Sequence, residues 1–233
     1  MNRITAALLA LFCTLGGCAE GGSRGSGIST AVEGNVASVQ IASLPPAPRG
    51  ATRTRPVSLR DLLAVEGVAR AGTDLEGIEV GLEDTAFQAQ TDAEGRFSLH
   101  GNFEGDATLV FQRPAGNLLA RLAINVPAAG TLTLNNVHID AAQGEASPES
   151  QSAQFEGIIT AIDCGASTMS MRSVQQSSTD LDLYTIRLDT SVVRDSHGNV
   201  LSCSDLQNGQ QGLVQAQVNS DGTFGNGTVE LLD

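Results

Sequence analysis

The sequence predicts an all-β protein, with a seven-stranded β-sandwich followed by a small antiparallel β-barrel. Apolar residues alternate with polar or small residues along many short segments, as at Ile78, Val80 and Leu82. This period of two is typical of half-buried antiparallel strands. Two polar, strand-poor stretches, residues 18–57 and 141–153, break the pattern and divide the chain into a tether, a first domain, a linker and a second domain.

The first element is a predicted signal peptide over residues 1–17. Arg3 precedes a short apolar segment, which ends in Leu15-Gly16-Gly17-Cys18 and is too short to span a membrane as a helix. This ending resembles the signal of bacterial lipoproteins. The resemblance implies that Cys18 becomes the lipid-modified first residue of the mature chain, and acyl chains such as palmitate give stable anchoring when two or more are present. In that class an Asp after the cysteine favours the inner membrane, so Ala19 favours the outer membrane.

Residues 18–57 are expected to form a flexible tether rich in Gly, Ser, Pro and Ala, with one possible strand around Val36 to Ile41. Four arginines cluster just after a Pro-rich stretch at residues 45–48. They favour a solvated linker, although a basic segment of this kind could also touch phosphates or an acidic face of its own domain. These four residues are Arg49, Arg53, Arg55 and Arg60.

The first domain, residues 58–140, reads as seven short strands, a number that suits a sandwich. In the last strand Leu132 and Leu134 do not share a face with Val137 and Ile139, so a β-bulge is expected near Asn135-Asn136. The expected strands are Leu63 to Ala69, Ile78 to Glu83, Phe87 to Thr91, Phe97 to His100, Thr108 to Phe111, Leu119 to Val126 and Thr131 to Ile139.

Several segments of this domain resemble the carboxypeptidase regulatory-like, transthyretin-like β-sandwich. They are VEGV at 65–68, LEGIEV at 75–80, TDAEGRFSL at 91–99 and GDATL at 105–109. The family usually has a Pro before the Gly of its second strand, where this chain has Glu76. The resemblance implies an accessory module for folding or recognition. The zinc motif HxxE of the peptidase domain is missing, since His100 and Glu104 are one residue too far apart.

A polar linker at residues 141–153 leads to the second domain, residues 154–233. This domain opens with FEGIITAIDC at 155–164 and closes with expected strands around Leu213 to Asn219 and Gly225 to Leu231. The order of its segments resembles an uncharacterised OB-like small β-barrel domain of bacterial envelope proteins.

Cysteine usage indicates an oxidising compartment. Cys13 leaves with the signal peptide and Cys18 carries lipid, so Cys164 and Cys203 remain and are expected to form a disulfide. Two buried free thiols are the alternative. A zinc site is disfavoured, because no CxxC or HxxxH spacing accompanies the pair.

The charge of the chain excludes nucleic acid as an expected partner. The formal net charge is −13, and all 13 basic residues are arginines. Such an acidic chain repels nucleic acid and anionic lipid head groups.

No motif of the chain predicts catalysis, a metal or a cofactor. The GxSxG sequence at residues 21–25 lies in the tether rather than between a strand and a helix. Residues 92–95 and 219–222 resemble calcium loops faintly, but turn chemistry explains them. The three histidines, His100, His138 and His197, are far apart in sequence, although the first two could meet across one sheet face. Four carboxylates around the middle of the barrel could supply an acid and a base, but their setting suggests exposed strand ends; these are Asp180, Asp182, Asp189 and Asp195.

We therefore expect a non-enzymatic, lipid-anchored envelope protein that acts as a structural or adaptor module. It would face the periplasm or the cell surface from the outer membrane, hold the membrane through Cys18 and bind an envelope protein partner, for example by strand addition to a sheet edge. The alternative is a ligand-binding lipoprotein, in which the barrel holds a small molecule, ion or oligosaccharide near Tyr184 and Arg187.

Overall fold

The computed structural model describes residues 30–41, 74–114, 116–174 and 183–232. Over these residues the protein is all-β, and its one helical element is a single 3-10 turn, η1 (Cys203–Asp205). No helix in this part of the chain is long and apolar enough to cross a membrane. The predicted signal peptide, Cys18, the Arg-rich stretch and the expected strand at Leu63 to Ala69 lie outside the described residues.

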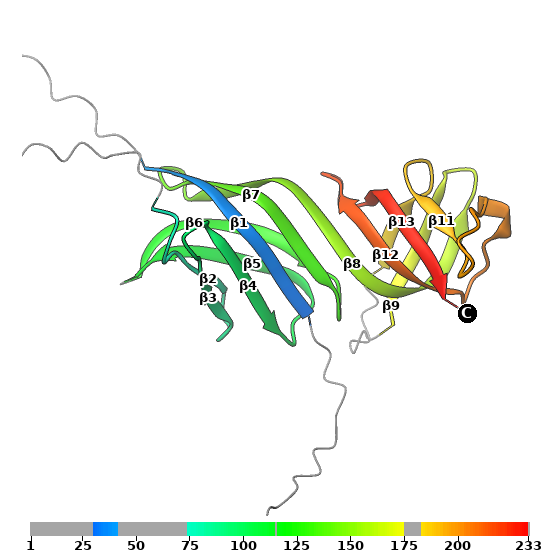
Figure 1. Cartoon of the computed structure of the whole chain (residues 1–233), viewed down its shortest axis with the longest axis horizontal. Helices are drawn as coiled ribbons and strands as arrows, with labels where there is room; N and C mark the ends of the chain where they lie inside the picture. The colour runs from blue at the N-terminus through cyan, green and yellow to red at the C-terminus, as the bar shows by residue number, and fades with distance from the viewer. Residues whose placement is uncertain (1–29, 42–73, 115, 175–182, 233) are drawn as a thin grey trace, which may run out of the picture.

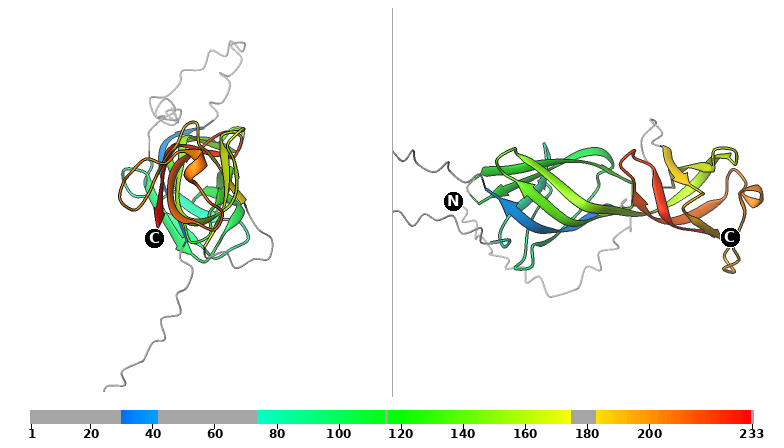
Figure 2. Two further views of the ribbon diagram at one scale, coloured as in Figure 1. Left: turned by 90° about the vertical axis from the view of Figure 1, so that its right-hand side faces the viewer. Right: turned by 90° about the horizontal axis from the view of Figure 1, so that it is seen from above.

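All the described strands belong to one hydrogen-bonded sheet. Figure 1 shows β1 to β7 on one side of the molecule and β9 to β13 on the other, with the long strand β8 running between them. From above, the two parts lie end to end (Figure 2). The strands are β1 (Thr30–Gln40), β2 (Glu79–Leu82), β3 (Gln88–Gln90), β4 (Arg96–Gly101), β5 (Gly105–Arg113), β6 (Asn117–Val126), β7 (Thr131–Asp140), β8 (Glu145–Asp163), β9 (Thr168–Ser173), β10 (Leu183–Arg187), β11 (Val192–Arg194), β12 (Gln211–Val218) and β13 (Phe224–Leu232).

The first part encloses a core between two runs of paired strands. One run is β4-β1-β7-β8 and the other is β6-β5-β2-β3, and the single bridge between Arg121 and Glu145 joins them. Phe97 of β4 meets Phe111 of β5 edge to face, with ring centroids 6.0 Å apart. Because both rings are buried, they pack the two runs against each other.

Strand β1 extends the one possible strand predicted within the tether of residues 18–57, because it begins already at Thr30. It pairs antiparallel with β4 and parallel with β7, and Val32 and Val36 are fully buried. At its start Ala31 donates a backbone hydrogen bond to Gly130 (2.9 Å), while the Thr30 hydroxyl accepts one from the Ala129 amide (3.2 Å). The possible strand at Val36 to Ile41 is thus the second half of a longer one, whose partners lie far away in sequence.

Strand β8 corrects the prediction of a linker at residues 141–153. Only residues 141–144 form a turn, and the chain is continuous strand from Glu145 onward. The first half of β8 pairs antiparallel with β7, from Asp140↔Glu145 to Thr131↔Gln154. This half is mostly polar and contains Pro148, so its composition resembles that of a linker although its backbone is in the sheet.

Five strands of the second part close into a barrel, in the order β8-β9-β10-β13-β12 and back to β8. Four of the five contacts are antiparallel, whereas β10 and β13 are parallel and share the single bridge Ile186↔Phe224. The sequence predicted an antiparallel barrel, and the parallel contact between β10 and β13 is an exception to that prediction. Strand β11 extends it by pairing in parallel with β13.

The expected bulge at Asn135-Asn136 is confirmed. Between Gly34↔Leu134 and Val36↔Val137 the register of β1 and β7 shifts by one residue, which places two residues of β7 opposite one of β1. Asn136 has a φ of 51°, a left-handed conformation that asparagine tolerates well. The shift allows the four apolar side chains of β7 to be buried together.

Candidate functional site

A polar outer face extends across six hydrogen-bonded neighbours, β4, β1, β7, β8, β12 and β13. Directly opposed residues form two rows across these strands, in which all positions but the buried Ala31 and Gly225 carry polar side chains. The first row is His100, Ala31, Thr131, Gln154, Gln215 and Thr228, and the second is Ser98, Glu33, Thr133, Ser152, Gln217 and Gly225.

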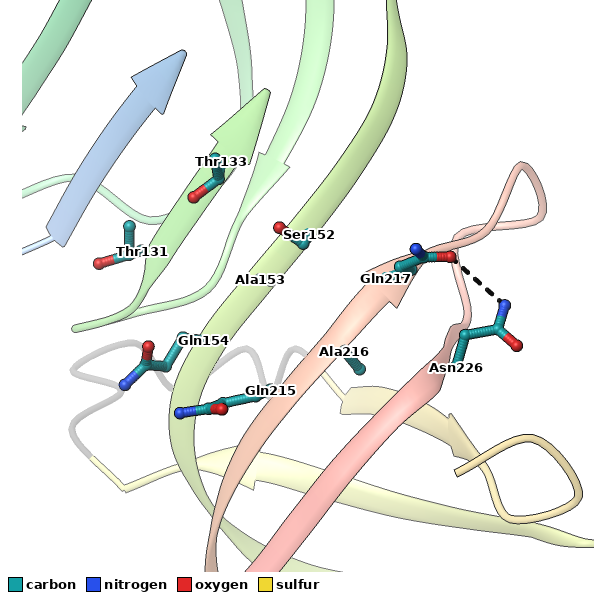
Figure 3. A pocket seen from close by; sticks show the side chains of 9 residues that line it. All are labelled: Thr131, Thr133, Ser152, Ala153, Gln154, Gln215, Ala216, Gln217 and Asn226. Atoms are coloured by element: carbon teal, nitrogen blue, oxygen red, sulfur yellow. Dashed lines mark hydrogen bonds between the residues drawn. The ribbon is translucent and has the colours of Figure 1, made fainter. Parts of the chain in front are cut away.

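One part of this face is hollowed where β7, β8, β12 and β13 come together (Figure 3). The depression has a volume of about 340 Å³. Its lining carries hydroxyl groups from β7 and β8 and amide groups from β8, β12 and β13, and none of its lining side chains is charged. The hydroxyls belong to Thr131, Thr133 and Ser152, and the amides to Gln154, Gln215, Gln217 and Asn226.

Strand alternation explains why these side chains face outward. On β12 the buried Val214 and Ala216 alternate with the exposed Gln215 and Gln217. The side chain of Gln217 accepts a hydrogen bond from the amide of Asn226 (3.4 Å). The one-sided character of β12 is visible in the sequence. The sequence does not show that the polar positions of β12 lie beside those of β7 and β8. Pairing between strands far apart in the sequence brings them together.

A second depression, of about 570 Å³, adjoins the first and shares Thr133 with it. It lies over β4, β1 and β7, and its lining includes Glu33, Glu94 and Arg96. The lining of the second depression is therefore partly charged, whereas the lining of the first is not.

Beside the second depression, side chains at the β7 bulge form a hydrogen-bonded cluster. Asn35 and Asn136 bond each other, and Asn136 and His138 both bond the carboxylate of Glu149, at 2.8 and 3.2 Å. The hydrogen bonds from Asn136 and then His138 lower the pKa of Glu149, which stays ionised at neutral pH. This cluster stabilises the bulge.

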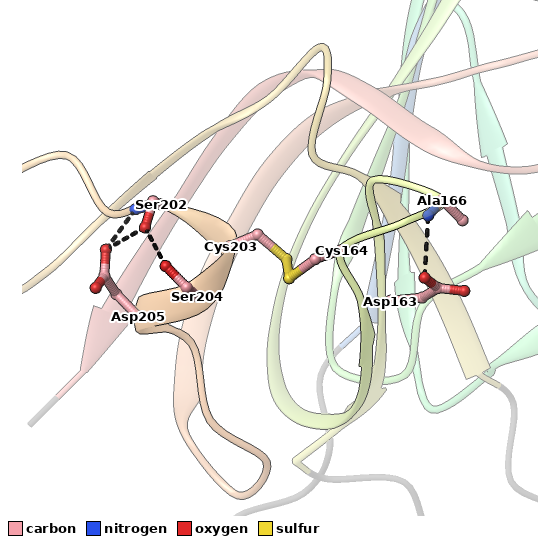
Figure 4. The surroundings of a disulfide bond; sticks show 7 residues. All are labelled: Asp163, Cys164, Ala166, Ser202, Cys203, Ser204 and Asp205. Carbon is pink, nitrogen blue, oxygen red and sulfur yellow. Dashed lines mark hydrogen bonds between the residues drawn. A yellow bond between two sulfur atoms is a disulfide. The ribbon is translucent and has the colours of Figure 1, made fainter.

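The predicted disulfide between Cys164 and Cys203 is confirmed, with Cα atoms 5.7 Å apart (Figure 4). It joins the turn after β8 to η1. Ser202 precedes η1 as its N-cap, and both its hydroxyl (2.5 Å) and its amide (2.8 Å) donate to the carboxylate of Asp205. These hydrogen bonds lower the pKa of Asp205.

The two residues proposed to bind a ligand, Tyr184 and Arg187, lie on opposite faces of β10. Tyr184 is buried inside the barrel, where its ring packs against Phe155 and Phe224 at centroid distances of 4.8 and 5.7 Å. Arg187 is on the outside and makes an ion pair with Asp189 (3.0 Å). The structure does not bring the two side chains into a common groove.

Of the predicted candidates for a catalytic pair, Asp189 and Asp195 fall within the described residues. The hydrogen bond from Arg187 lowers the pKa of Asp189, and hydrogen bonds led by that from Asn199 lower the pKa of Asp195. A general acid at neutral pH needs a raised pKa instead. These two carboxylates have the properties of groups that stabilise turns.

The histidines His100 and His138 do not meet. They lie on opposite sides of β1, beside Ala31 and Ser38 respectively, which puts them roughly 20 Å apart along the strand. Over the described residues, no group of three or more His, Cys, Asp or Glu side chains is placed to hold a metal ion.

Comparisons with protein-family models, with curated proteins and with solved structures find no match to this chain.

Proposed function

We propose that this chain is a lipid-anchored protein of the bacterial outer membrane that acts as a non-enzymatic structural or adaptor module, facing the periplasm or the cell surface. The sequence around Cys18 supports the anchor, and the Cys164–Cys203 disulfide supports an oxidising compartment. The membrane, through the lipid, and an envelope protein are the proposed partners, and nucleic acid is not one because the chain is strongly acidic.

We propose further that β1 to β7, with the first half of β8, form a β-sandwich of the carboxypeptidase regulatory-like kind. Six of the seven strands expected from the sequence coincide with β2 to β7, which supports this assignment. The ring of five strands supports an OB-like second domain, since the OB-fold is a five-stranded, partly open barrel. In this assignment β8 belongs to both domains.

An adaptor is favoured over a protein that holds its ligand inside the barrel, because the barrel interior is filled. Phe155, Tyr184 and Phe224 are at most 4% exposed and pack against one another at ring-centroid distances of 4.8 to 5.7 Å. A ligand inside the barrel would have to displace this cluster, although Tyr184 and Phe224 also line a depression of about 290 Å³ beside Asp106 and Asn125. The alternative function, ligand binding by the barrel, would be supported by a thermal shift that Tyr184→Phe abolishes.

The observation that carries the adaptor proposal is the open side of β6. This strand pairs with β5 along its length, but among the described strands it meets β8 only at Arg121↔Glu145. The Arg121 amide donates to Gly144 on that side (3.0 Å), so by the antiparallel alternation the backbone groups of Ala123 and Asn125 also point there. Such a row of backbone donors and acceptors can accept a strand from a partner.

Site-specific photo-crosslinking in cells tests this proposal. A photo-crosslinking amino acid at Ala123, beside the open edge, should capture one recurrent envelope protein that mass spectrometry identifies. The same substitution at Glu230, an exposed position on β13 with a strand paired on each side, is the matched control and should not capture it. Cys18→Ala in the Ala123 version should abolish the crosslink if lipidation places the protein. Equal capture from both positions, or none from Ala123, would contradict the adaptor proposal.

A further inference from the structure

We propose that the polar outer face around Thr131, Ser152, Gln154 and Gln215 binds a neutral oligosaccharide. The proposal depends neither on the lipid anchor nor on the β6 edge. The face that it concerns is formed by other strands, β7, β8, β12 and β13.

The first argument is unused hydrogen-bonding capacity. Within the described residues, the side chains of Thr131, Gln154 and Gln215 make no hydrogen bond to another protein group. Each amide offers two donors and an acceptor, and each hydroxyl offers a donor and two acceptors. Sugar hydroxyls also donate and accept, so closely spaced amides and hydroxyls match them.

The second argument comes from charge. The net charge of −13 opposes anionic ligands, yet no carboxylate lines the depression in Figure 3 that could attract a cation or a basic peptide. The cores of protein interfaces are enriched in aromatic residues, Met and Arg. None of these lines this depression, so a neutral, polar ligand fits it better than a protein does.

The third argument is the extent of the face. The first depression, of about 340 Å³, extends over β7, β8, β12 and β13, and it adjoins the second, whose lining is partly charged. Four strands at the usual spacing span about 14 Å across their axes. A face of this length suits a chain of several sugar units rather than a single small molecule. Without an aromatic platform in the first depression, hydrogen bonds carry the binding, and the affinity is expected to be weak.

Ligand-observed NMR and isothermal titration calorimetry test the proposal on the full chain carrying Cys18→Ala. The probes are two neutral oligosaccharides, cellotetraose and chitotetraose, and one anionic oligosaccharide, tetragalacturonic acid. At least one neutral probe should bind, and the anionic probe should bind more weakly.

The double variant Gln154→Ala/Gln215→Ala should weaken the binding of that neutral probe about tenfold, because each lost hydrogen bond lowers the affinity severalfold. The matched control is Gln88→Ala/Gln90→Ala, which removes two exposed strand amides from β3. It should leave binding unchanged, and circular dichroism should show both variants folded. The proposal is overturned if neither neutral probe binds, if the anionic probe binds as well, or if both double variants lose affinity equally.

Discussion

Removing the Cys164–Cys203 disulfide should lower the stability of the barrel by about 4 kcal/mol. The bond joins residues 39 positions apart, and the chain-entropy model assigns about 4 kcal/mol at 25 °C to a loop of this size. The loop includes β9, β10 and β11, so its cross-link restricts the unfolded state of much of the barrel. Cys164 is exposed, and its replacement therefore removes little buried apolar surface.

The assay is urea unfolding of the full chain with Cys18→Ala, followed by circular dichroism. The variant Cys164→Ala/Cys203→Ala should unfold at lower urea, and its thermal midpoint should fall by roughly 8–16 °C, if the chain unfolds as one unit of this size. Reducing agent should shift the protein with the intact disulfide to the stability of the double variant, and it should leave the double variant unchanged. A loss below about 1 kcal/mol would refute the reasoning, because the bond would then not limit the unfolded chain as the model requires.

Three further perturbations test the core, β1 and η1. Phe155→Ala should destabilise the protein by about 3–5 kcal/mol in urea unfolding, because this side chain is 1% exposed and fills the barrel. Gly34→Ala should cost about 1–3 kcal/mol, since an added Cβ would lie 2.8 Å from both the Phe97 ring and the Leu134 carbonyl oxygen; an unchanged midpoint would contradict this close packing of β1 between β4 and β7. Asp205→Asn should destabilise the protein at neutral pH. Because hydrogen bonds from Ser202 depress the pKa of this carboxyl, its contribution is present above the unfolded pKa of about 3.9 and is lost as pH falls through the folded value. The difference in melting temperature between variant and parent should therefore shrink below about pH 4, and a constant difference would contradict this reason.

Local patterns in the sequence predicted most of the strands correctly. The alternation at Ile78, Val80 and Leu82 corresponds to β2, and the mismatch of faces in β7 predicted the bulge that Asn136 forms. The pairing of Cys164 with Cys203 followed from the count of cysteines left after Cys13 was assigned to a predicted signal peptide and Cys18 to a predicted lipid site. The strands and the bulge could be predicted because they depend on residues close together in the chain. The disulfide could be predicted because only two cysteines remained to pair.

The two errors of organisation share a cause. The first half of β1 was assigned to a tether, with only a possible strand from Val36 onward, and the first half of β8, which is mostly polar, was assigned to a linker. Each is stabilised by partners on neighbouring strands: β1 lies between β4 and β7, and β8 continues from the pairing with β7 into the barrel. Backbone hydrogen bonds to distant strands thus override a composition that favours loops.

By itself, the sequence determined the all-β class, the position of most strands, the disulfide and the acidic character of the chain, because alternation, turn residues and charge are local properties. The tertiary structure decided which strands are neighbours. It closed β8, β9, β10, β13 and β12 into a ring and buried Tyr184 inside it. It also aligned Thr131, Gln154 and Gln215 on one face, since strand pairing between distant segments is governed by the packing of the whole core rather than by any one segment.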